Sequence, residues 1–260
     1  MINFFRKTRK KMADDNRPLK YARYAIGEIA LVVIGILIAL QINNWNETRK
    51  QNLTEMEVLN DIIIGLDTDK GTLDYTIKRH NWAIESCNII LKSLSEDKNY
   101  NDSLAYHFAR VHNYTNFYSN KGAYESLKTI GFEIISNKRL RNEIINLYDQ
   151  WYSIQQSNVN ILSNDIQYIK RVYSQDYFDK FNVFNTKSLN NKSDDIKNDW
   201  YSGEMIPNDF DKLKLDKRFI YQIKTLQLSH ESVNFHSMRR KEQIDNLIKN
   251  IKLEINRLER

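Results

Sequence analysis

The hydrophobic positions of the chain follow two different patterns. From Ala25 to Ile42 almost every side chain is apolar, and residues 29–40 contain no polar side chain. As an α-helix, this segment would extend about 27 Å, close to the thickness of the hydrocarbon core of a bilayer. We therefore predict a transmembrane helix over residues 25–42.

Beyond this segment, apolar residues recur with the seven-residue repeat of packed helices. The pattern runs from Met56 to Leu94 and predicts one long helix over about residues 47–95, followed by a turn at 97–102. One heptad series comprises Met56, Ile63, Lys70, Ile77, Ile84 and Leu91, and the other Leu59, Leu66, Leu73, His80, Cys87 and Leu94.

Three further helical regions are predicted, over about 103–133 with a break near 120–122, 137–181 and 216–260. The polar segment 182–211 is expected to be irregular, and the chain contains only two prolines and seven glycines that could break helices elsewhere. In 137–181 the expected buried stripe comprises Leu140, Ile144, Leu147, Trp151, Ile154, Ile161, Tyr168 and Val172. The predicted fold is all-α, with one N-terminal transmembrane helix followed by an antiparallel, four-helix-bundle-like domain over 43–260.

Charge gives the expected orientation. The first 24 residues carry eight basic and two acidic side chains, whereas the twenty residues after Ile42 supply only Arg49 and Lys50 as basic residues. The positive-inside rule therefore places the tail, residues 1–24, in the cytoplasm. Since the rest of the chain is nearly neutral, the pI near 9.1 comes from this tail, which indicates contact with anionic lipid headgroups and not with nucleic acid. Trp45 suits the aromatic belt at the far interface.

The same segment has other interpretations. A basic region before an apolar run is also typical of a cleaved signal peptide, but the long basic region and the poor cleavage site favour an uncleaved signal-anchor. Within the span, Glu28 is either a functional intramembrane carboxylate or snorkels to the interface near Arg23. Gly35 and Ala39 form a small-residue step that would let another helix approach closely.

Candidate chemistry in the remaining chain is sparse. The five histidines show no metal-ligand spacing beside a glutamate, and Cys87 is the single cysteine. Cys87 falls on an apolar stripe, which favours a buried hydrophobic role over a reactive thiol. The sequence contains neither a glycine-rich phosphate loop nor a nucleophile motif. We expect no catalytic activity, no cofactor and no metal site.

Polar interruptions and one short helix leave alternatives open. Lys70, His80, Asn158 and Asp165 interrupt the apolar stripes, as register-setting positions or as parts of a small polar pocket. Gly122 and Gly131 bracket a short helix in which Leu127 and Ile130 are expected to face the same way as Ala123. Tyr124 on this helix either packs against neighbouring helices or offers an aromatic anchor to a partner.

Two blocks of sequence carry a resemblance. The amino-terminal run MINFFRKTRKKMADDNRPLKYARYAIGEIALVVIGILIALQINNWNE, together with KGAYESLKTIG at 121–131 and LRNEIINLY at 140–148, is similar to an uncharacterised family of single-span membrane proteins from the Bacteroidota. The resemblance implies a Gram-negative cell, an inner-membrane anchor and a periplasmic domain, and it supplies no activity or catalytic residue.

Two functions are compatible with these features. The first is a membrane-anchored scaffold or partner-binding accessory protein, whose partner is another protein or a second copy of the chain. The second is a receptor-like accessory protein that senses a small molecule and signals through a membrane partner. Because only about 24 residues are expected inside the cell, the sequence favours the first.

Overall fold

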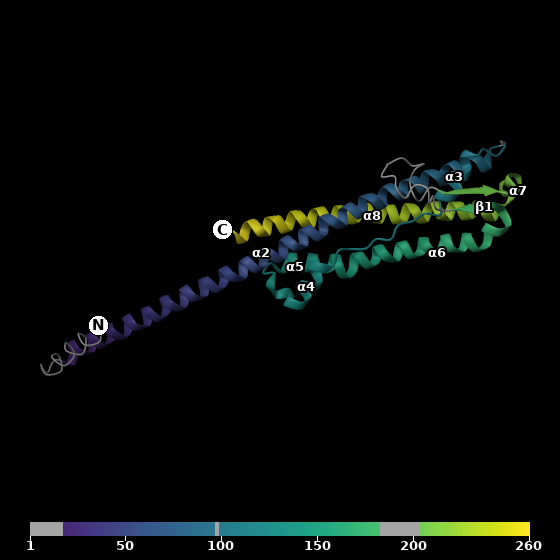
Figure 1. Ribbon diagram of the computed structural model, residues 1–260. Coiled ribbons are helices and arrows are strands. Elements are labelled where there is room, and N and C mark those ends of the chain that lie inside the picture. Colours follow the sequence, from purple (N-terminus) through teal and green to yellow (C-terminus); the bar gives the residue numbers. More distant parts are fainter. Residues whose placement is uncertain (1–17, 97–98, 183–202) are drawn as a thin grey trace. The chain divides into compact units, whose positions relative to one another are not determined.

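The computed structural model describes residues 18–96, 99–182 and 203–260. These residues are mostly helical and contain one two-stranded sheet (Figure 1). The chain divides after Glu55 into an N-terminal and a C-terminal unit, and helix α2, Pro18–Ser95, contributes residues to both.

In the N-terminal unit, the apolar segment of α2 is fully exposed. An 18-residue window of this helix has a mean hydropathy of 2.5, and none of it is buried. Among the described residues, α2 is the one helix long and apolar enough to cross a membrane. The predicted long apolar helix near the N-terminus is therefore present, and the tail before Pro18 lies outside the described residues.

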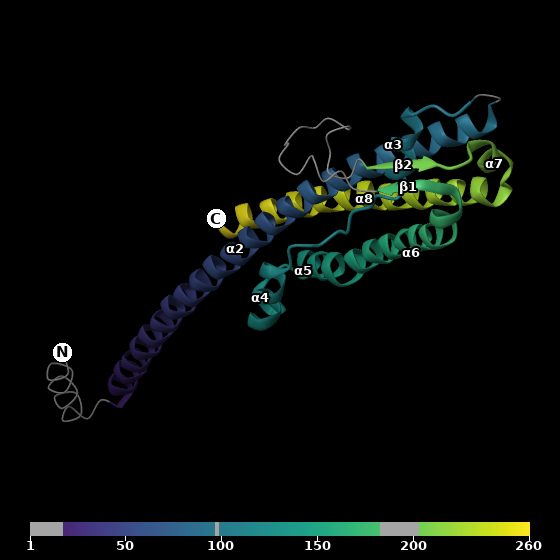
Figure 2. The ribbon, with the colours of Figure 1, turned by 45° about the vertical axis from the view of Figure 1, so that its right-hand side comes forward.

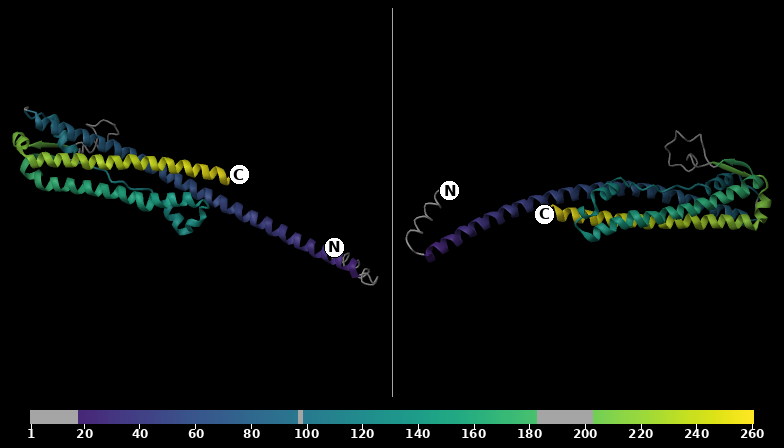
Figure 3. Two further views of the ribbon diagram at one scale, coloured as in Figure 1. Left: turned by 180° about the vertical axis from the view of Figure 1, so that it is seen from behind. Right: turned by 90° about the horizontal axis from the view of Figure 1, so that it is seen from below.

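The C-terminal unit combines the rest of α2 with short and long helices. Its helices are α3 (Ser103–Arg110), α4 (Gly122–Ile130), the 3-10 helix η1 (Phe132–Ile134), α5 (Lys138–Ile145), the π-helix η2 (Asn146–Trp151), α6 (Tyr152–Tyr177), α7 (Phe210–Leu215) and α8 (Lys217–Leu258). Helices α6 and α8 lie side by side (Figure 3). Strands β1 (Phe178–Asn182) and β2 (Glu204–Pro207) pair antiparallel beside α3 (Figure 2).

Polar side chains join α2 to α8. Lys70 forms an ion pair with Asp245, and Lys241 forms one with Asp74. Further along α2, Asn81 accepts a hydrogen bond from Asn234 at 2.6 Å. Asn88 accepts a hydrogen bond from Gln227 at 3.1 Å. Residue numbers therefore rise along α2 while those of their partners fall along α8.

The buried face of α2 differs in part from the expected one. The series Leu59 to Leu94 is buried throughout, as predicted, but the series that begins at Met56 is only half-buried. The second buried series is Ile62, Asp69, Thr76, Ala83 and Ile90. Asp69 and Thr76 are polar, so a search for apolar repeats passes over this series even though its spacing is also seven residues.

The predicted stripe on α6 is wrong after Leu147. The buried residues there are Tyr152, Gln155, Val159, Leu162, Ile166, Ile169 and Tyr173, each one position after the expected stripe. A π-helix closes i to i+5 hydrogen bonds and so takes up one extra residue. Since η2 lies between α5 and α6, it shifts the buried face of every following turn by one position.

Two boundaries also differ. Helix α3 ends at Arg110, so residues 111–121, predicted to be mostly helical, have no regular structure. This segment is rich in Asn, Ser and Thr, whose side chains compete for backbone hydrogen bonds. The segment expected to be irregular, 182–211, contains β2 and the start of α7, and residues 183–202 lie outside the described residues. Phe178 to Asn182 form strand β1 and not the end of the preceding helix.

Candidate ligand pocket

The π-helix η2 marks the most unusual local geometry of the C-terminal unit. Such wide helical turns occur frequently at functional sites, because the inserted residue redirects neighbouring side chains. Here η2 and the first turn of α6 present Tyr148, Asp149 and Tyr152 to the non-helical segment 117–121.

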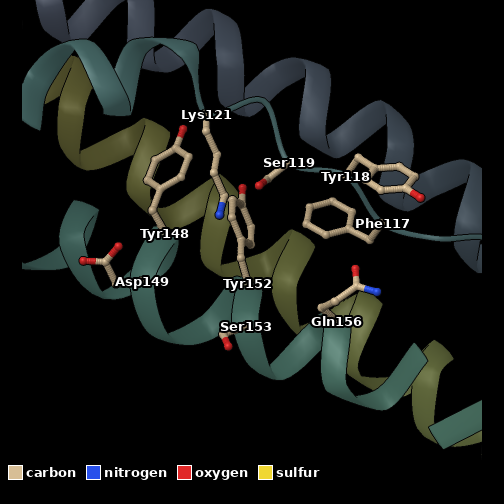
Figure 4. A pocket seen from close by; sticks show the side chains of 9 residues that line it. All are labelled: Phe117, Tyr118, Ser119, Lys121, Tyr148, Asp149, Tyr152, Ser153 and Gln156. Carbon is tan, nitrogen blue, oxygen red and sulfur yellow. The ribbon is translucent and has the colours of Figure 1, made fainter. Parts of the chain in front are cut away.

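A cavity of about 460 Å³ lies between these two segments (Figure 4). This volume is in the range of sites for small organic molecules. Its aromatic lining comprises Phe117, Tyr118, Tyr148 and Tyr152, and its polar lining comprises Ser119, Lys121, Asp149, Ser153 and Gln156. We call this cavity the pocket.

A continuous row of rings supports one side of the pocket. Tyr124 stacks on Tyr148 with centroids 4.4 Å apart and an interplanar angle of 8°. Tyr148 meets Tyr152 edge-on at 5.2 Å, and Tyr152 meets Phe117 edge-on at 5.0 Å. All four side chains are buried, so the row is a rigid apolar surface, with both favoured aromatic geometries present.

A buried carboxylate holds the two sides of the pocket together. Asp69 of α2 accepts a hydrogen bond from the Tyr152 hydroxyl at 2.5 Å and from the backbone N–H of Asn120 at 2.6 Å. Burial nevertheless raises the pKa of Asp69, although both hydrogen bonds act to lower it. Asp69 does not line the pocket, so we assign it a positioning role for Tyr152 and for the segment before Lys121.

The two charged side chains at the rim of the pocket differ in their ion-pair partners. The Lys128 ammonium lies 3.6 Å from the Asp149 carboxylate and 3.5 Å from the Glu125 carboxylate, so the two carboxylates share this counter-ion. Among the described residues, Lys121 forms no ion pair, and its side chain reaches toward the rings of Tyr148 and Tyr152 (Figure 4). Lys121 is exposed, so the rim of the pocket offers one solvated ammonium group that has no ion pair with a described residue.

The Tyr148 hydroxyl is a second unused group. Its side chain is only 2 % exposed, and the hydroxyl has no hydrogen-bond partner within the part of the chain that the structure describes. Burial and the Asp69 charge raise the pKa of Tyr148, so the hydroxyl keeps its proton and remains a donor. An unpaired buried hydroxyl costs free energy, and this one is closed to solvent beside Gly65 of α2.

A histidine pair lies deeper in the same unit. His230 donates from Nε2 to the carbonyl of Val111 at 3.1 Å, so its Nδ1 is an acceptor when the ring is neutral. His80 then donates from Nδ1 to that atom at 2.8 Å. Burial lowers the pKa of both rings, to about 4 for His230. Among the described residues, no group of three His, Cys, Asp or Glu side chains is placed to hold a metal ion.

The structure brings one predicted site residue, Tyr124, to the pocket region. Tyr124 is 1 % exposed, so the packing alternative holds and the exposed-anchor alternative is wrong. On α4 the buried face is formed by Tyr124 and Leu127, while Ile130 points to solvent, contrary to the expected grouping with Ala123. Tyr124 does not line the pocket, but its ring stacks on Tyr148, which does.

The other candidates lie in the N-terminal unit, away from any cavity described. Gly35, Ala39 and Trp45 are exposed on α2, and an added Cβ at Gly35 would meet nothing within 4 Å. Glu28 is half-buried. In the C-terminal unit, Cys87 is fully buried, as predicted, and burial raises the pKa of its thiol to about 12.

Three of the polar residues that interrupt the predicted stripes connect neighbouring helices, and the fourth, Asn158, does not. Besides the Lys70 ion pair and the His80 contact, Asp165 accepts a hydrogen bond from Ser229 at 2.5 Å. Asn158 donates to the backbone carbonyl of Ile154 in its own helix. Sequence reasoning missed Asp69, Lys121, Tyr148 and Tyr152; the seven-residue spacing of Asp69 from Ile62 and Thr76 was the available signal.

The model of a family of unknown function, DUF6090, matches residues 28–206, which is more than half of the chain. The chain therefore belongs to this family. The matched range includes most of the apolar segment and every residue that lines the pocket. No curated protein and no solved structure matches the chain.

Proposed function

We propose that this member of the DUF6090 family is a membrane-anchored accessory protein that binds a small molecule in the pocket and acts on a protein partner in the membrane. The observation that carries this proposal is the pocket itself, a cavity of about 460 Å³ that is bordered by the row of rings and by the Lys121 side chain. We propose binding and not catalysis, because the carboxylate of the lining, Asp149, lies 3.6 Å from the Lys128 ammonium, and the buried Asp69 behind Tyr152 is engaged by two donors.

The membrane anchor in this proposal is residues 25–42, crossing once with the tail in the cytoplasm. The exposed apolar side chains of this segment and the eight-to-two excess of basic residues in the tail support it. The periplasmic location of the C-terminal unit and the inner membrane rest on the resemblance to proteins of the Bacteroidota. Anionic headgroups are the proposed partners of the tail.

For the C-terminal unit we propose an antiparallel helical bundle. The opposite order of the paired residues along α2 and α8 supports this arrangement. The contacts between α6 and α8 support a third long member.

A scaffold function is the second candidate, and exposed apolar side chains favour it. Ile161 and Tyr168 on α6 and Leu228 on α8 are exposed. Ile161 and Leu228 line a second cavity of about 210 Å³ between these helices. A partner protein or a second copy could cover this surface.

Blocking the pocket tests the main proposal. Full-length protein in lipid nanodiscs would be screened with a fragment library by ligand-observed NMR. Ser153→Trp should fill the pocket, because Ser153 lines it and is exposed; Ser157→Trp, one turn along the same helix and outside the lining, is the matched control. We expect fragments that bind the wild type and the control but not Ser153→Trp. Identical binding to all three proteins, or no binding, would reject the proposal.

Topology is tested separately with a membrane-impermeant thiol reagent in intact spheroplasts. The native Cys87 is buried, so added cysteines report accessibility. A cysteine that replaces Lys252 should react and one in the tail should not. Reaction of the tail cysteine would reverse the proposed orientation, and a shortened soluble product would indicate a cleaved signal peptide.

A further inference from the structure

Six apolar side chains on α6 and α8 form an exposed face outside the pocket. Ile161 and Leu228 line one cavity of about 210 Å³ between these two helices, which lie side by side (Figure 3). The other four continue from these two in steps of four or seven residues, so they share the same helix faces. We call the six residues the outer face: Ile161, Tyr168 and Val172 of α6, and Tyr221, Leu228 and Phe235 of α8.

The outer face lacks the charges that are typical of a solvated surface. Of the whole chain, 28 % of the residues are charged, but the exposed side chains of α6 between residues 153 and 168 include no charged one. The single charged residue in that range, Asp165, accepts a hydrogen bond from Ser229 of α8. Arg171, Lys224 and Glu231 are exposed at the border of the face. Because the centre of a protein interface is likewise depleted of charge and enriched in Tyr and Phe, this composition indicates a face that another protein covers.

The exposed area matches what a stable interface needs. At roughly 200 Å² of surface for each large apolar or aromatic residue, six residues that are about half exposed present roughly 650 Å². Stable protein–protein interfaces bury roughly 600–1,000 Å² on each partner. A second copy that offers the same face therefore completes an interface of ordinary size.

Two hydrogen bonds give the register of α6 against α8. Gln155 donates to Ser237 at 2.8 Å, and Ser229 donates to Asp165 at 2.5 Å. Residue numbers therefore rise along α6 while those of their partners fall along α8. In this register Ile161 lies level with the small residue Ser232.

This register makes the outer face complementary to itself. Ile161 projects with 57 % of its surface exposed, and the cavity that it lines with Ser232 lies at the same level. The cavity is smaller than most ligand sites and has room for about one side chain. A two-fold axis along the helices keeps each residue at its level, so it places Ile161 of one copy opposite the cavity of the other.

We infer that the outer face joins two copies of this chain. Helix α6 of each copy packs against α8 of the other, which gives a four-helix bundle in which all neighbours are antiparallel. This inference deepens the scaffold candidate, on which it rests, and it is independent of ligand binding in the pocket.

Copurification of two differently tagged full-length copies, coexpressed and extracted in a mild detergent, tests the inference. We expect each wild-type tag to recover the other. Leu228→Asp in both copies should weaken this association at least about tenfold, because two carboxylates would be buried without partners. Leu253→Asp is the matched control and should change nothing, since Leu253 is a similarly exposed leucine of α8 outside the outer face.

A cysteine pair tests the arrangement of the helices. Asn164 lies on the flank of Ile161 opposite to the cavity, and Glu231 lies on the corresponding flank of Leu228 at nearly the same level. Asn164→Cys in one copy should therefore form a disulfide with Glu231→Cys in the other on mild oxidation in membranes. Asn164→Cys paired with Lys252→Cys should not, and the native Cys87 is buried.

The outcomes distinguish this inference from the other proposals. Copies that do not recover each other, or Asn164→Cys crosslinks to a different protein in place of a second copy, would overturn it. Undiminished copurification of Leu228→Asp would place the contact on another surface and would also overturn it. The Ser153→Trp screen decides separately whether the pocket binds a ligand.

Discussion

Helix α2 contains two apolar regions with opposite organisation. In residues 26–42 the apolar side chains surround the helix and are exposed, whereas from Leu59 to Leu94 they occupy one face and are buried. Ile64 is an exposed exception within the second region: 64 % of its surface is exposed, compared with 51 % for Ile34 in the first region, but the surroundings of the two isoleucines differ. Ile34 has apolar neighbours on every side, while Ile64 lies on the polar face of its turn.

The comparison shows that exposure alone does not indicate what an apolar side chain contacts in the cell. A continuous apolar surface around a helix is stable only in lipid or against other helices, whereas an isolated exposed isoleucine is common on soluble domains. The buried region, in turn, accepts polar residues such as Asp69 and His80, because neighbouring helices and the segment 111–121 supply hydrogen-bond partners.

Arginine substitutions in the two regions of α2 should have the largest effect, which is on membrane integration. Ile34→Arg combined with Leu37→Arg should prevent stable membrane integration, because each arginine at the centre of a span costs about 3 kcal/mol on insertion scales. Membrane fractionation and carbonate extraction measure the outcome. Ile64→Arg is the matched control and should leave the protein in the membrane with an unchanged melting temperature. Equal fractionation of all variants would show that residues 25–42 do not lie in lipid.

The second largest expected effect is a loss of folding stability of the buried region at acidic pH. Burial lowers the pKa of His112 and His230 to about 4, and the unfolded chain has histidine pKa values near 6.5. Between these values the unfolded chain binds protons that the folded protein does not, so stability falls as the pH drops from about 6.5 to about 4. Each histidine contributes roughly 3 kcal/mol to this loss.

Denaturant unfolding in steps from pH 7 to 4.5 tests this acid sensitivity. The variant His230→Gln should show a smaller loss than the wild type, since one of the buried rings no longer titrates. His236→Gln is the comparison variant: burial lowers the pKa of His236 as well, but His236 is only partly buried, so this change should reduce the loss less than His230→Gln does. A stability that stays constant over this range in the wild type would contradict the prediction.

The sequence predicted the elements with continuous apolar periodicity and failed where polar residues or irregular turns intervene. The long apolar helix and the buried series from Leu59 to Leu94 follow directly from the pattern. The face of α6 was wrong because no periodicity signals the extra residue of η2. The pocket combines this shifted face with segment 117–121, in which the sequence predicts a helix for residues 117–119 and a break only from residue 120, so the geometry of the pocket does not follow from the sequence.

In the buried region of α2, the stability of the fold depends on the hydrogen-bond partner of Asp69, and the exposed region contains no comparable buried carboxylate. Tyr152→Phe should destabilise the C-terminal unit by about 2 kcal/mol, because Asp69 would keep only the Asn120 N–H as a donor. In an Asp69→Asn background the same change should cost less, with a coupling of about 1 kcal/mol. Tyr118→Phe, on an exposed ring of the same pocket, is the control. Additive effects of the two substitutions would indicate that the Asp69 hydrogen bond contributes little.

The smallest expected effect comes from a methyl group added in each region of α2. Gly71 is exposed in the C-terminal unit, and a Cβ there would meet nothing within 4 Å. Gly71→Ala should therefore stabilise this unit by up to about 1 kcal/mol, because alanine loses less conformational entropy in a helix. Gly35→Ala is equally free of contacts in the structure, but it should leave the thermal unfolding of the C-terminal unit unchanged. If Gly35 and Ala39 pack against a partner helix in the membrane, Gly35→Ala should instead reduce crosslinking in membranes. Unchanged crosslinking would remove the small-residue step as a contact surface, and a lower melting temperature for Gly71→Ala would show that this part of α2 is covered in the full protein.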